Sequence, residues 1–276
     1  MSGSPLPPRI AGRAVVGARR AGGGSINDAY RVELEGGASA FVKTRADAAP
    51  GEYAAEAAGL AWLTAGGARV PAVLEAADGF LALEWLDEGQ LDATGEEELG
   101  RMLATTHAAG ADAFGAPAGE LRIGPIVLPD APTDDWARCY AERRLLPLLP
   151  RAGLSTAGAR AAEQVCARMG DLTGPPEPPA RLHGDLWSGN VLASDGRPFL
   201  IDPAAYGGHR EVDLAMLQLF GTPSPRTLAA YDEVHPRAEG HEDRVALWQL
   251  FPLLVHAVLF GGGYVDAVER AARRYL

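Results

Sequence analysis

Residues 181–203, RLHGDLWSGNVLASDGRPFLIDP, decide the fold of this chain. The stretch places four polar side chains at fixed intervals: His183, Asp185, Asn190 and Asp202. Carboxylate and imidazole groups move protons, and carboxylate and amide oxygens hold hard metal ions. The spacing therefore indicates a site of chemistry.

The residues between Asn190 and Asp202 predict a β-hairpin. Two short apolar runs, 191–193 and 199–201, are separated by SDGRP, which contains an Asp-Gly pair favoured in tight turns. A hairpin carries Asp202 back to the level of Asn190. An acid and an amide then meet at one end of it, as hard oxygen donors that suit magnesium.

The spacing from Asp185 to Asn190 is that of the kinase catalytic loop H-R-D-x-x-x-x-N, in which Asp accepts the substrate hydroxyl proton and Asn holds magnesium. Asp202, followed by Pro-Ala, stands where kinases have D-F-G, whose Asp bridges magnesium to the nucleotide phosphates. The alternative is that these are ordinary turn residues, since Asp, Asn, Gly and Ser populate turns for local hydrogen-bonding reasons. That alternative suits any one of them, but the four together between two strands favour a catalytic loop.

Composition argues against several classes of protein. The 276 residues are 47% apolar and carry a formal charge of −11, which disfavours nonspecific binding to nucleic acid or anionic lipid. No apolar run is long enough to cross a bilayer, and the N-terminus lacks the apolar core of a signal peptide, so we expect a cytoplasmic protein that does not bind membranes. Cys139 and Cys166, in helical-looking sequence, indicate neither a disulfide framework nor a metal cluster.

The basic residues are almost all arginine. Of the 25 Lys and Arg residues, Lys43 is the only lysine. Arg is a planar fork and Lys a compact point charge, so a site that holds phosphate oxygens with Lys need not accept Arg. The alternative is the chance survival of one lysine.

The first third of the chain predicts a small β-rich lobe. Strands are expected at 13–18, 30–34 and 39–44, and in the runs VPAVLEA and FLALEWL. The first two are separated by a glycine-rich turn whose backbone amides can approach phosphate oxygens. The residues assigned to this contact are Gly23, Gly24 and Ser25.

One helix is expected in this lobe, in the Ala-rich segment that ends at two glycines. It carries Glu56, and kinases pair such a glutamate with the strand lysine; Glu52, one turn earlier, is the competing candidate. The last strand ends near Glu84 and Leu86. We expect the link between the lobes, and the backbone edge that meets adenine, at these two residues.

The remainder of the chain is mainly helical by its apolar periodicity. Tyr206-Gly207-Gly208 is predicted to be a turn, and Asp213 in the helix after it to brace the catalytic loop from beneath. The expected fold is therefore α+β and bilobal, like that of protein kinases. Residues 1–86 form a nucleotide-binding lobe with an antiparallel sheet and one helix, and residues 87–276 form a larger helical lobe for catalysis and substrate binding. The helices are expected in 95–108, 135–153, 156–172, 211–220 and the apolar stretch from 241, with an amphipathic terminal helix after three glycines.

With HGDLWSGN, IDPAAYGGHREVDLAM and LWQLFPLLVHAVLFG, the chain resembles the fructosamine kinase family, also called ketosamine 3-kinases. These belong with the aminoglycoside phosphotransferases and choline kinases in the protein-kinase-like fold. The resemblance extends from GGGSINDAY to the C-terminal helices, and the Trp of HGDLWSGN and the block HREVDLAM are its most specific parts. It implies transfer of the γ-phosphoryl group of ATP, with Mg²⁺, to the 3-hydroxyl of a ketosamine such as a ribulosamine or fructosamine, a reaction that repairs glycated amines or protein.

The resemblance also implies roles for individual residues. Asp185 is expected to be the catalytic base, Asn190 and Asp202 the magnesium ligands, and Lys43 with Glu56 the phosphate clamp. For His256 the alternative is a core histidine. The residues expected to contact the substrate are Trp187, His209 and His256.

Two departures from the family pattern bear on these expectations. Some members have a cysteine where this glycine-rich loop has Ser25, and that loop has been linked with redox-sensitive pairing between chains, so Ser25 argues against such a switch and favours a monomer. Members often have Tyr-Tyr-Gly before the H-R-E block, where this chain has Tyr-Gly-Gly at 206–208. The loss of one aromatic ring is expected to widen the sugar site.

Two alternatives remain. The first is another kinase of this fold, acting on an aminoglycoside or choline; a strongly acidic pocket beside Asp185 would support it. The second is a nucleotide-binding pseudokinase, against which the intact lysine, Asp, Asn and Asp of the motifs argue. The acids that a polycation pocket could use are Asp134, Asp135, Glu211 and Asp213.

Overall fold

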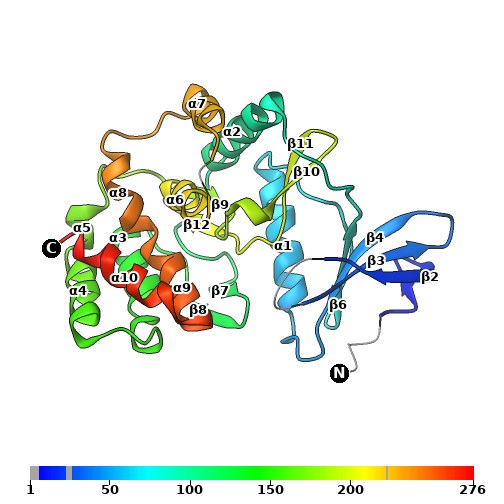
Figure 1. The fold of residues 1–276 in the computed structure, drawn as a ribbon, viewed down its shortest axis with the longest axis horizontal. Helices are drawn as coiled ribbons and strands as arrows, with labels where there is room; N and C mark the ends of the chain where they lie inside the picture. Colours follow the sequence, from blue (N-terminus) through cyan, green and yellow to red (C-terminus); the bar gives the residue numbers. More distant parts are fainter. Residues whose placement is uncertain (1–5, 23–26, 222) are drawn as a thin grey trace.

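The structure, a computed structural model, describes residues 6–22, 27–221 and 223–276. It has a β-rich N-terminal lobe and a mainly helical C-terminal lobe, with α1 (Glu52–Ala65) lying between the sheet and the second lobe (Figure 1). This confirms the predicted α+β architecture. The predicted boundary near residue 86 falls in the segment 85–92, which forms neither helix nor strand.

The N-terminal sheet has six antiparallel strands in the order β1-β2-β3-β4-β6-β5. Successive side chains of a strand point to opposite faces, so Val42 and Ala82 are buried on one face of the sheet. On the other face, Leu81 of β6 packs with Tyr53 and Leu60 of α1. The strands are β1 (Arg9–Ile10), β2 (Arg13–Arg20), β3 (Asp28–Leu34), β4 (Ser39–Thr44), β5 (Val73–Ala77) and β6 (Phe80–Glu84).

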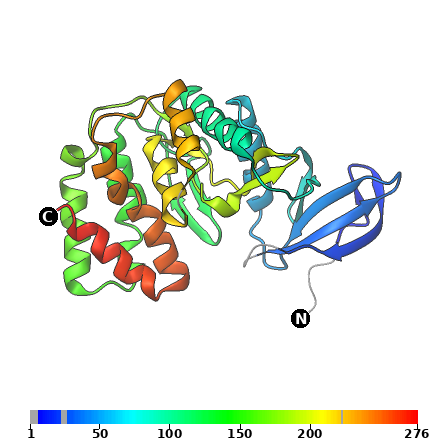
Figure 2. The same ribbon diagram turned by 45° about the horizontal axis from the view of Figure 1, so that its top comes forward.

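The C-terminal lobe packs helices around a core that includes Tyr140, Trp248 and Phe251, with three small antiparallel hairpins or strand pairs. The C-terminal helices lie on the side of the molecule far from the N-terminal sheet (Figure 2). In chain order the elements are α2 (Ala93–Ala108), β7 (Glu120–Ile123), β8 (Ile126–Pro129), α3 (Trp136–Cys139), a π-helix (Tyr140–Leu145), a 3₁₀ turn (Leu149–Arg151), α4 (Thr156–Ala167), α5 (Met169–Leu172), β9 (Ala180–Leu182), a 3₁₀ turn (Ser188–Asn190), β10 (Val191–Ser194), β11 (Arg197–Leu200), β12 (Tyr206–Gly208), α6 (Glu211–Leu219), α7 (Pro225–Val234), α8 (His241–Trp248), α9 (Leu250–Phe260) and α10 (Gly263–Arg273).

Three of the predicted helices are broken into shorter pieces. The apolar stretch from 241 is interrupted at Gln249, where α8 ends and α9 begins. Pro252 has no N–H group and so cannot bond to the carbonyl of Trp248 four residues earlier. The hydroxyl of Tyr140 donates to that carbonyl instead, at 2.9 Å. The predicted helix at 135–153, which contains two prolines, becomes α3, the π-helix and a 3₁₀ turn, and 156–172 divides at Arg168.

Contrary to the expectation that no apolar run is long enough to cross a bilayer, the stretch His241–Phe260 is long and apolar enough by length and composition. More than half of it is buried inside the C-terminal lobe, where α9 contributes seven buried residues. Its apolar character is accounted for by this burial.

The predicted turn at Tyr206–Gly208 is wrong, because these residues form β12 and pair with β9. Gly207 exchanges backbone hydrogen bonds with Gly115, at 2.8 and 3.0 Å. A β-carbon on Gly207 would lie 2.0 Å from the carbonyl oxygen of Ala113. The glycine is therefore needed for the close approach of three chain segments.

Candidate active site

The predicted hairpin is present and brings Asn190 and Asp202 to one end. β10 and β11 pair in antiparallel register, and the backbone N–H of Ile201 donates to the carbonyl of Asn190 at 3.1 Å. Asp202 has a φ of 54°, an uncommon value for a residue other than glycine. Such strained backbone positions cluster at functional sites, and this one turns the Asp202 side chain out of the hairpin.

Asp185 lies against Asn190, as the motif predicts. The side-chain nitrogen of Asn190 donates to the backbone carbonyl of Asp185 at 2.8 Å and to its Oδ2 at 3.2 Å. Burial raises the pKa of Asp185, and the negative charges of Asp202 and Asp213 raise it further. The hydrogen bond from Asn190 lowers the pKa, but its effect is smaller than that of burial, and the resulting pKa is about 6. The carboxylate is thus a base whose pKa lies close to neutral pH.

Lys43 joins the two lobes through two carboxylates. Its Nζ lies 2.5 Å from Glu56 Oε2 on α1 and 3.0 Å from Asp202 Oδ1 at the end of the catalytic hairpin. Burial alone would lower the pKa of Lys43, but the two carboxylates outweigh it and hold the pKa above its ordinary value. The competing candidate, Glu52, is bound to Arg45 at 2.7 Å.

Asp213 lies beneath the catalytic loop. Its carboxylate accepts hydrogen bonds from the backbone N–H groups of His183 and Gly184, at 2.7 and 2.9 Å, and lies 3.3 Å from Nε2 of His107. Burial opposes its ionisation, but the His107 ring and these donors hold the pKa of Asp213 below its usual range. Gly184 has a φ of 82° and a β-carbon there would meet the carbonyl of Ala204 at 2.0 Å, so the loop requires glycine.

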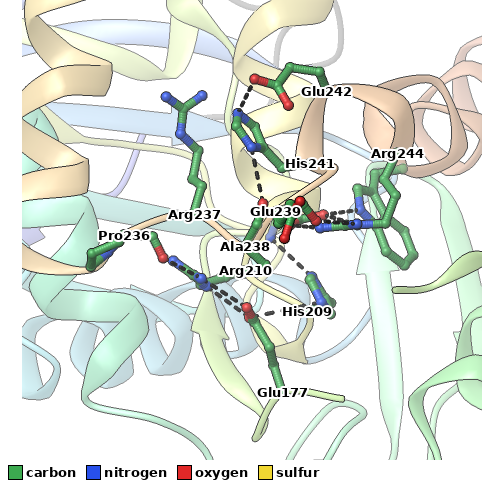
Figure 3. Close-up of polar contacts among 12 residues, drawn as sticks. Glu177, His209, Arg210, Pro236, Arg237, Ala238, Glu239, His241, Glu242 and Arg244 are labelled. Atoms are coloured by element: carbon green, nitrogen blue, oxygen red, sulfur yellow. Dashed lines mark hydrogen bonds and ion pairs between the residues drawn. The ribbon is translucent and has the colours of Figure 1, made fainter. Parts of the chain in front are cut away.

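The start of α6 is fixed by two bidentate ion pairs (Figure 3). Glu177 accepts from Nε and Nη2 of Arg210, both at 2.8 Å. Glu211 accepts from Nε and Nη2 of Arg244, at 2.8 and 2.7 Å, and from the indole of Trp248 at 2.8 Å. Bidentate ion pairs fix the orientation of the two side chains as well as the distance between them. They therefore hold α6 so that Asp213 faces the loop in one position.

His209 does not lie where a substrate could touch it. Its side chain is buried, with 3% of the residue exposed, and stacks on Trp248 at 5.0 Å between ring centroids. Its Nδ1 accepts from the backbone N–H of Glu211 at 3.3 Å, and its Nε2 is 3.8 Å from Glu177. The predicted substrate contact from His209 is therefore not supported, because the ring is part of the buried network in Figure 3.

The acids considered for a polycation pocket do not gather beside Asp185. Glu211 and Asp213 are buried and already paired, while Asp135 caps α3 by accepting from the N–H of Arg138 at 2.9 Å. A polycationic acceptor needs free carboxylates facing the cleft. Asp134 is exposed, and neither it nor Asp135 lines the cleft that contains Asp185, so these residues supply none.

Trp187 and His256 meet in one aromatic cluster. Phe220 connects them, with ring centroids 6.0 Å from Trp187 and 4.8 Å from His256, and Tyr264 lies 5.0 Å from His256. We call these four residues the aromatic cluster. Trp187 is 38% exposed and only two positions from Asp185, so a flat apolar surface lies beside the base. Sequence reasoning missed Phe220 and Tyr264, whose apolar spacing reads simply as helix core.

Arg181 was also not predicted as a site residue, because nothing in the sequence distinguishes it from the other arginines. Its Nη1 donates to the carbonyl of Trp62 at 2.5 Å and its Nε to that of Gly110 at 3.2 Å, and the guanidinium lies 4.7 Å from the Trp62 ring centroid. It ties the end of α1, which carries Glu56, to the strand that enters the catalytic loop.

The remaining predicted contacts concern the nucleotide. Gly23, Gly24 and Ser25 lie outside the residues that the structure describes. Glu84 ends β6, where its N–H donates to Ala72 at 2.8 Å and its carboxylate accepts from the Ala72 N–H at 3.1 Å. Leu86 is partly buried in the link that follows. An adenine contact at these two residues stays a prediction.

Comparison with known proteins agrees with this geometry. Residues 10–276 match the family described as fructosamine kinase. A curated relative from Thermus thermophilus, named as a ketoamine kinase, is 36% identical over 90% of each chain. A chloroplastic protein from rice, named as a protein-ribulosamine 3-kinase, is 33% identical over 95% of this chain and 79% of its own.

Solved structures give the same result. A crystal structure from Thermobifida fusca that carries the name of a fructosamine-3-kinase superposes with a TM-score of 0.89 at 46% identity, over 96% of this chain and 95% of the other. A macrolide 2'-phosphotransferase from Brachybacterium faecium superposes with a TM-score of 0.61 at 18% identity, over 95% and 94% of the two chains. The second likeness shows the shared fold alone.

Proposed function

The chain belongs to the fructosamine kinase family and is a phosphotransferase, and from this premise we propose that it transfers the γ-phosphoryl group of ATP to the 3-hydroxyl of a ketosamine. The observation that carries the proposal is the arrangement around one cleft. Asp185, Asn190 and the Lys43–Asp202 pair converge there, and the exposed ring of Trp187 lies two positions from the base.

The nucleotide phosphates are assigned to the Lys43 end of the cleft. Glu56 holds the ammonium in place, so its charge is oriented before ATP binds and little reorganisation is needed in the transition state. Asp202 is 47% exposed at its side chain, so it can turn to a ligand while Glu56 keeps the lysine.

The donor set at the end of the hairpin suits magnesium carried in with ATP. Asn190 makes its side-chain hydrogen bonds through Nδ2, which leaves its oxygen for a cation, and the Asp202 carboxylate stands beside it. Among the described residues no group of three His, Cys, Asp or Glu side chains could hold a metal by itself, so phosphate oxygens would complete the coordination. Magnesium bound there would neutralise charge on the phosphates.

Asp185 is assigned the acceptor hydroxyl. Its carboxylate orients that group in line with the γ-phosphorus and takes its proton as the new P–O bond forms and the bond to the leaving ADP oxygen breaks. A pKa of about 6 leaves the carboxylate ionised at neutral pH. A positioned base of this kind contributes on the order of 10²–10⁴ in rate.

The test is substrate-dependent ADP release with Mg-ATP, in which ribulose-lysine and fructose-lysine are offered beside kanamycin and choline. We expect turnover on the ketosamines alone, with the phosphate located on the 3-hydroxyl by NMR. Turnover only on kanamycin or choline would overturn the substrate assignment and leave the fold and the base in place.

A further inference from the structure

Asp185 also helps to line a cavity that is separate from the aromatic cluster. It is a cavity of about 460 Å³ between α1 and the β7–β8 hairpin, and none of the four aromatic cluster residues lines it. We call it the outer cleft. Its lining includes small side chains, such as Ala55 and Gly59 of α1 and Ala118 before the hairpin. It also includes Lys43, Glu56 and Asp202, which are assigned above to the phosphates, so the part available to the acceptor is the part towards β7.

The assignment of the two ends of the substrate rests on the proposed function. In a ketosamine the amine is attached to carbon 1 and the reacting hydroxyl to carbon 3, so the amine substituent and the sugar tail leave the reacting region in opposite directions. Trp187 of the aromatic cluster stands two positions from Asp185 in the chain, and Asp185 itself lines the outer cleft, so each end has a surface to meet. The C–H faces of a sugar pack on aromatic rings, which assigns the tail to the aromatic cluster. The amine substituent then enters the outer cleft.

Apart from Asp185 and the phosphate-site residues Lys43, Glu56 and Asp202, the outer cleft carries two ion pairs. Glu120 and Arg122 occupy alternate positions of β7 and so share one face of the strand. They are 2.6 Å apart and keep 44% and 26% of their side chains exposed. Opposite them, Arg45 pairs with Glu52 at 2.7 Å.

Arg45 has capacity left for a ligand. Its Nη1 is buried and has no hydrogen-bond partner among the described residues. A buried donor without a partner costs free energy, which an incoming carboxylate or a water would recover. Paired charges of both signs on facing walls match a zwitterion better than a simple cation or anion.

We propose that the outer cleft binds the amine substituent of the substrate and that Arg122 and Glu120 recognise an α-carboxylate and an α-ammonium group. The preferred substrate is then a free amino acid glycated on its side-chain amine, such as ε-glycated lysine. In a polypeptide both α-groups are amides and carry no charge, so a glycated lysine within a folded protein lacks the feature that the cleft selects.

The experiment compares three ribulosamines: that of free lysine on its ε-amine, its Nα-acetyl methylamide derivative, and that of butylamine. Free ribulose-lysine should have a kcat/KM about tenfold above the capped form, mainly through KM, because one charge-assisted hydrogen bond is worth roughly that factor. Arg122→Gln should remove most of this preference, and Glu120→Gln part of it, while turnover of the butylamine derivative stays unchanged and shows that each variant is folded.

Arg138→Gln is the control, since Arg138 also forms an exposed ion pair, with Glu142 at 2.9 Å, and neither residue lines the cleft. It should leave all three values unchanged. Equal kcat/KM for free and capped lysine, an equal loss on all three substrates in Arg122→Gln, or faster turnover of a glycated protein would overturn the inference. No turnover on any ribulosamine, including that of butylamine, would instead remove the proposed function on which it rests.

Discussion

Asp213 Oδ2 lies 2.7 Å from the backbone nitrogen of His183 and accepts its hydrogen bond. A carboxylate on α6 thus holds the start of the catalytic loop, and its other oxygen holds Gly184 at 2.9 Å. Because Asp185 is the next residue, its position depends on a charge that touches neither ATP nor acceptor. The ion pairs of Arg210 and Arg244 fix the helix that carries this charge.

Replacing Asp213 with asparagine should therefore weaken both folding and turnover. One acceptor oxygen becomes an amide that faces an N–H donor, which leaves a buried polar group unpaired and costs about 1–3 kcal/mol of unfolding free energy. We expect kcat to fall with little change in the KM for ATP, measured by urea unfolding and steady-state rates. Asp135→Asn, at an exposed helix cap where Asn serves equally well, is the control. Wild-type stability of Asp213→Asn would show that the loop does not depend on this charge.

Lys43→Arg tests whether the single lysine is required. Nζ fits between Glu56 at 2.5 Å and Asp202 at 3.0 Å with 7% of the side chain exposed, so a planar guanidinium has no room to keep both contacts. The kcat/KM for ATP should drop at least a hundredfold, a loss of about 2.7 kcal/mol in transition-state stabilisation. Arg138→Lys, at an exposed ion pair outside the cleft, should leave it unchanged. Near-wild-type rates in Lys43→Arg would show that the site does not require lysine and that its retention is due to chance.

The catalytic hairpin and the Lys43–Glu56 pair could be predicted because their geometry follows from local spacing. Asn190 and Asp202 meet through a hairpin of their own stretch, and Lys43 is marked by its uniqueness. The turn predicted at Tyr206–Gly208 was wrong. Its glycines allow this segment to pack closely against residues 113–115, and the local sequence does not indicate that those residues lie nearby.

Which of several similar residues meets a distant segment could not be predicted. His209 and His256 both stand in motif-like surroundings, yet one is buried against Trp248 and the other joins Phe220 near the base. Which histidine joins the exposed aromatic cluster is decided by helix packing, which periodicity alone does not reveal. The β7–β8 hairpin was missed for the same reason, since its short strands carry no distinct alternation.

Asp185→Asn should be more stable than the wild type at pH 8. Burial raises the pKa of Asp185 from 3.8 to about 6, so the folded state binds the proton more tightly than the unfolded state. The carboxylate therefore costs stability as pH rises from about 4 to 6, and the cost is constant above that range. The gain in Asp185→Asn should be on the order of 1–3 kcal/mol at pH 8 and vanish near pH 4. Urea unfolding at both pH values measures it, and a gain that does not change with pH would contradict this ionisation.

The same group should shape the pH dependence of turnover. Only the ionised carboxylate accepts the hydroxyl proton, so kcat/KM for the ketosamine, at saturating Mg-ATP, should rise with pH up to about 6 and then level. A rise centred near 4 would mean that bound ATP and magnesium cancel the effect of burial before the acceptor enters. A profile flat to pH 4 would remove Asp185 as the base.

The most direct test of the central claim is the turnover of Asp185→Asn on ribulose-lysine with Mg-ATP, beside Asp195→Asn. Asp195 lies in the exposed turn of the same hairpin and has a φ of 51°, which asparagine also tolerates. The control Asp195→Asn therefore makes the same Asp-to-Asn change away from the cleft. We predict that Asp185→Asn folds, keeps its affinity for ATP and loses about 10²–10⁴ in kcat, while Asp195→Asn stays at the wild-type rate. Near-wild-type turnover of a folded Asp185→Asn would contradict the assignment of Asp185 as the base that receives the acceptor proton.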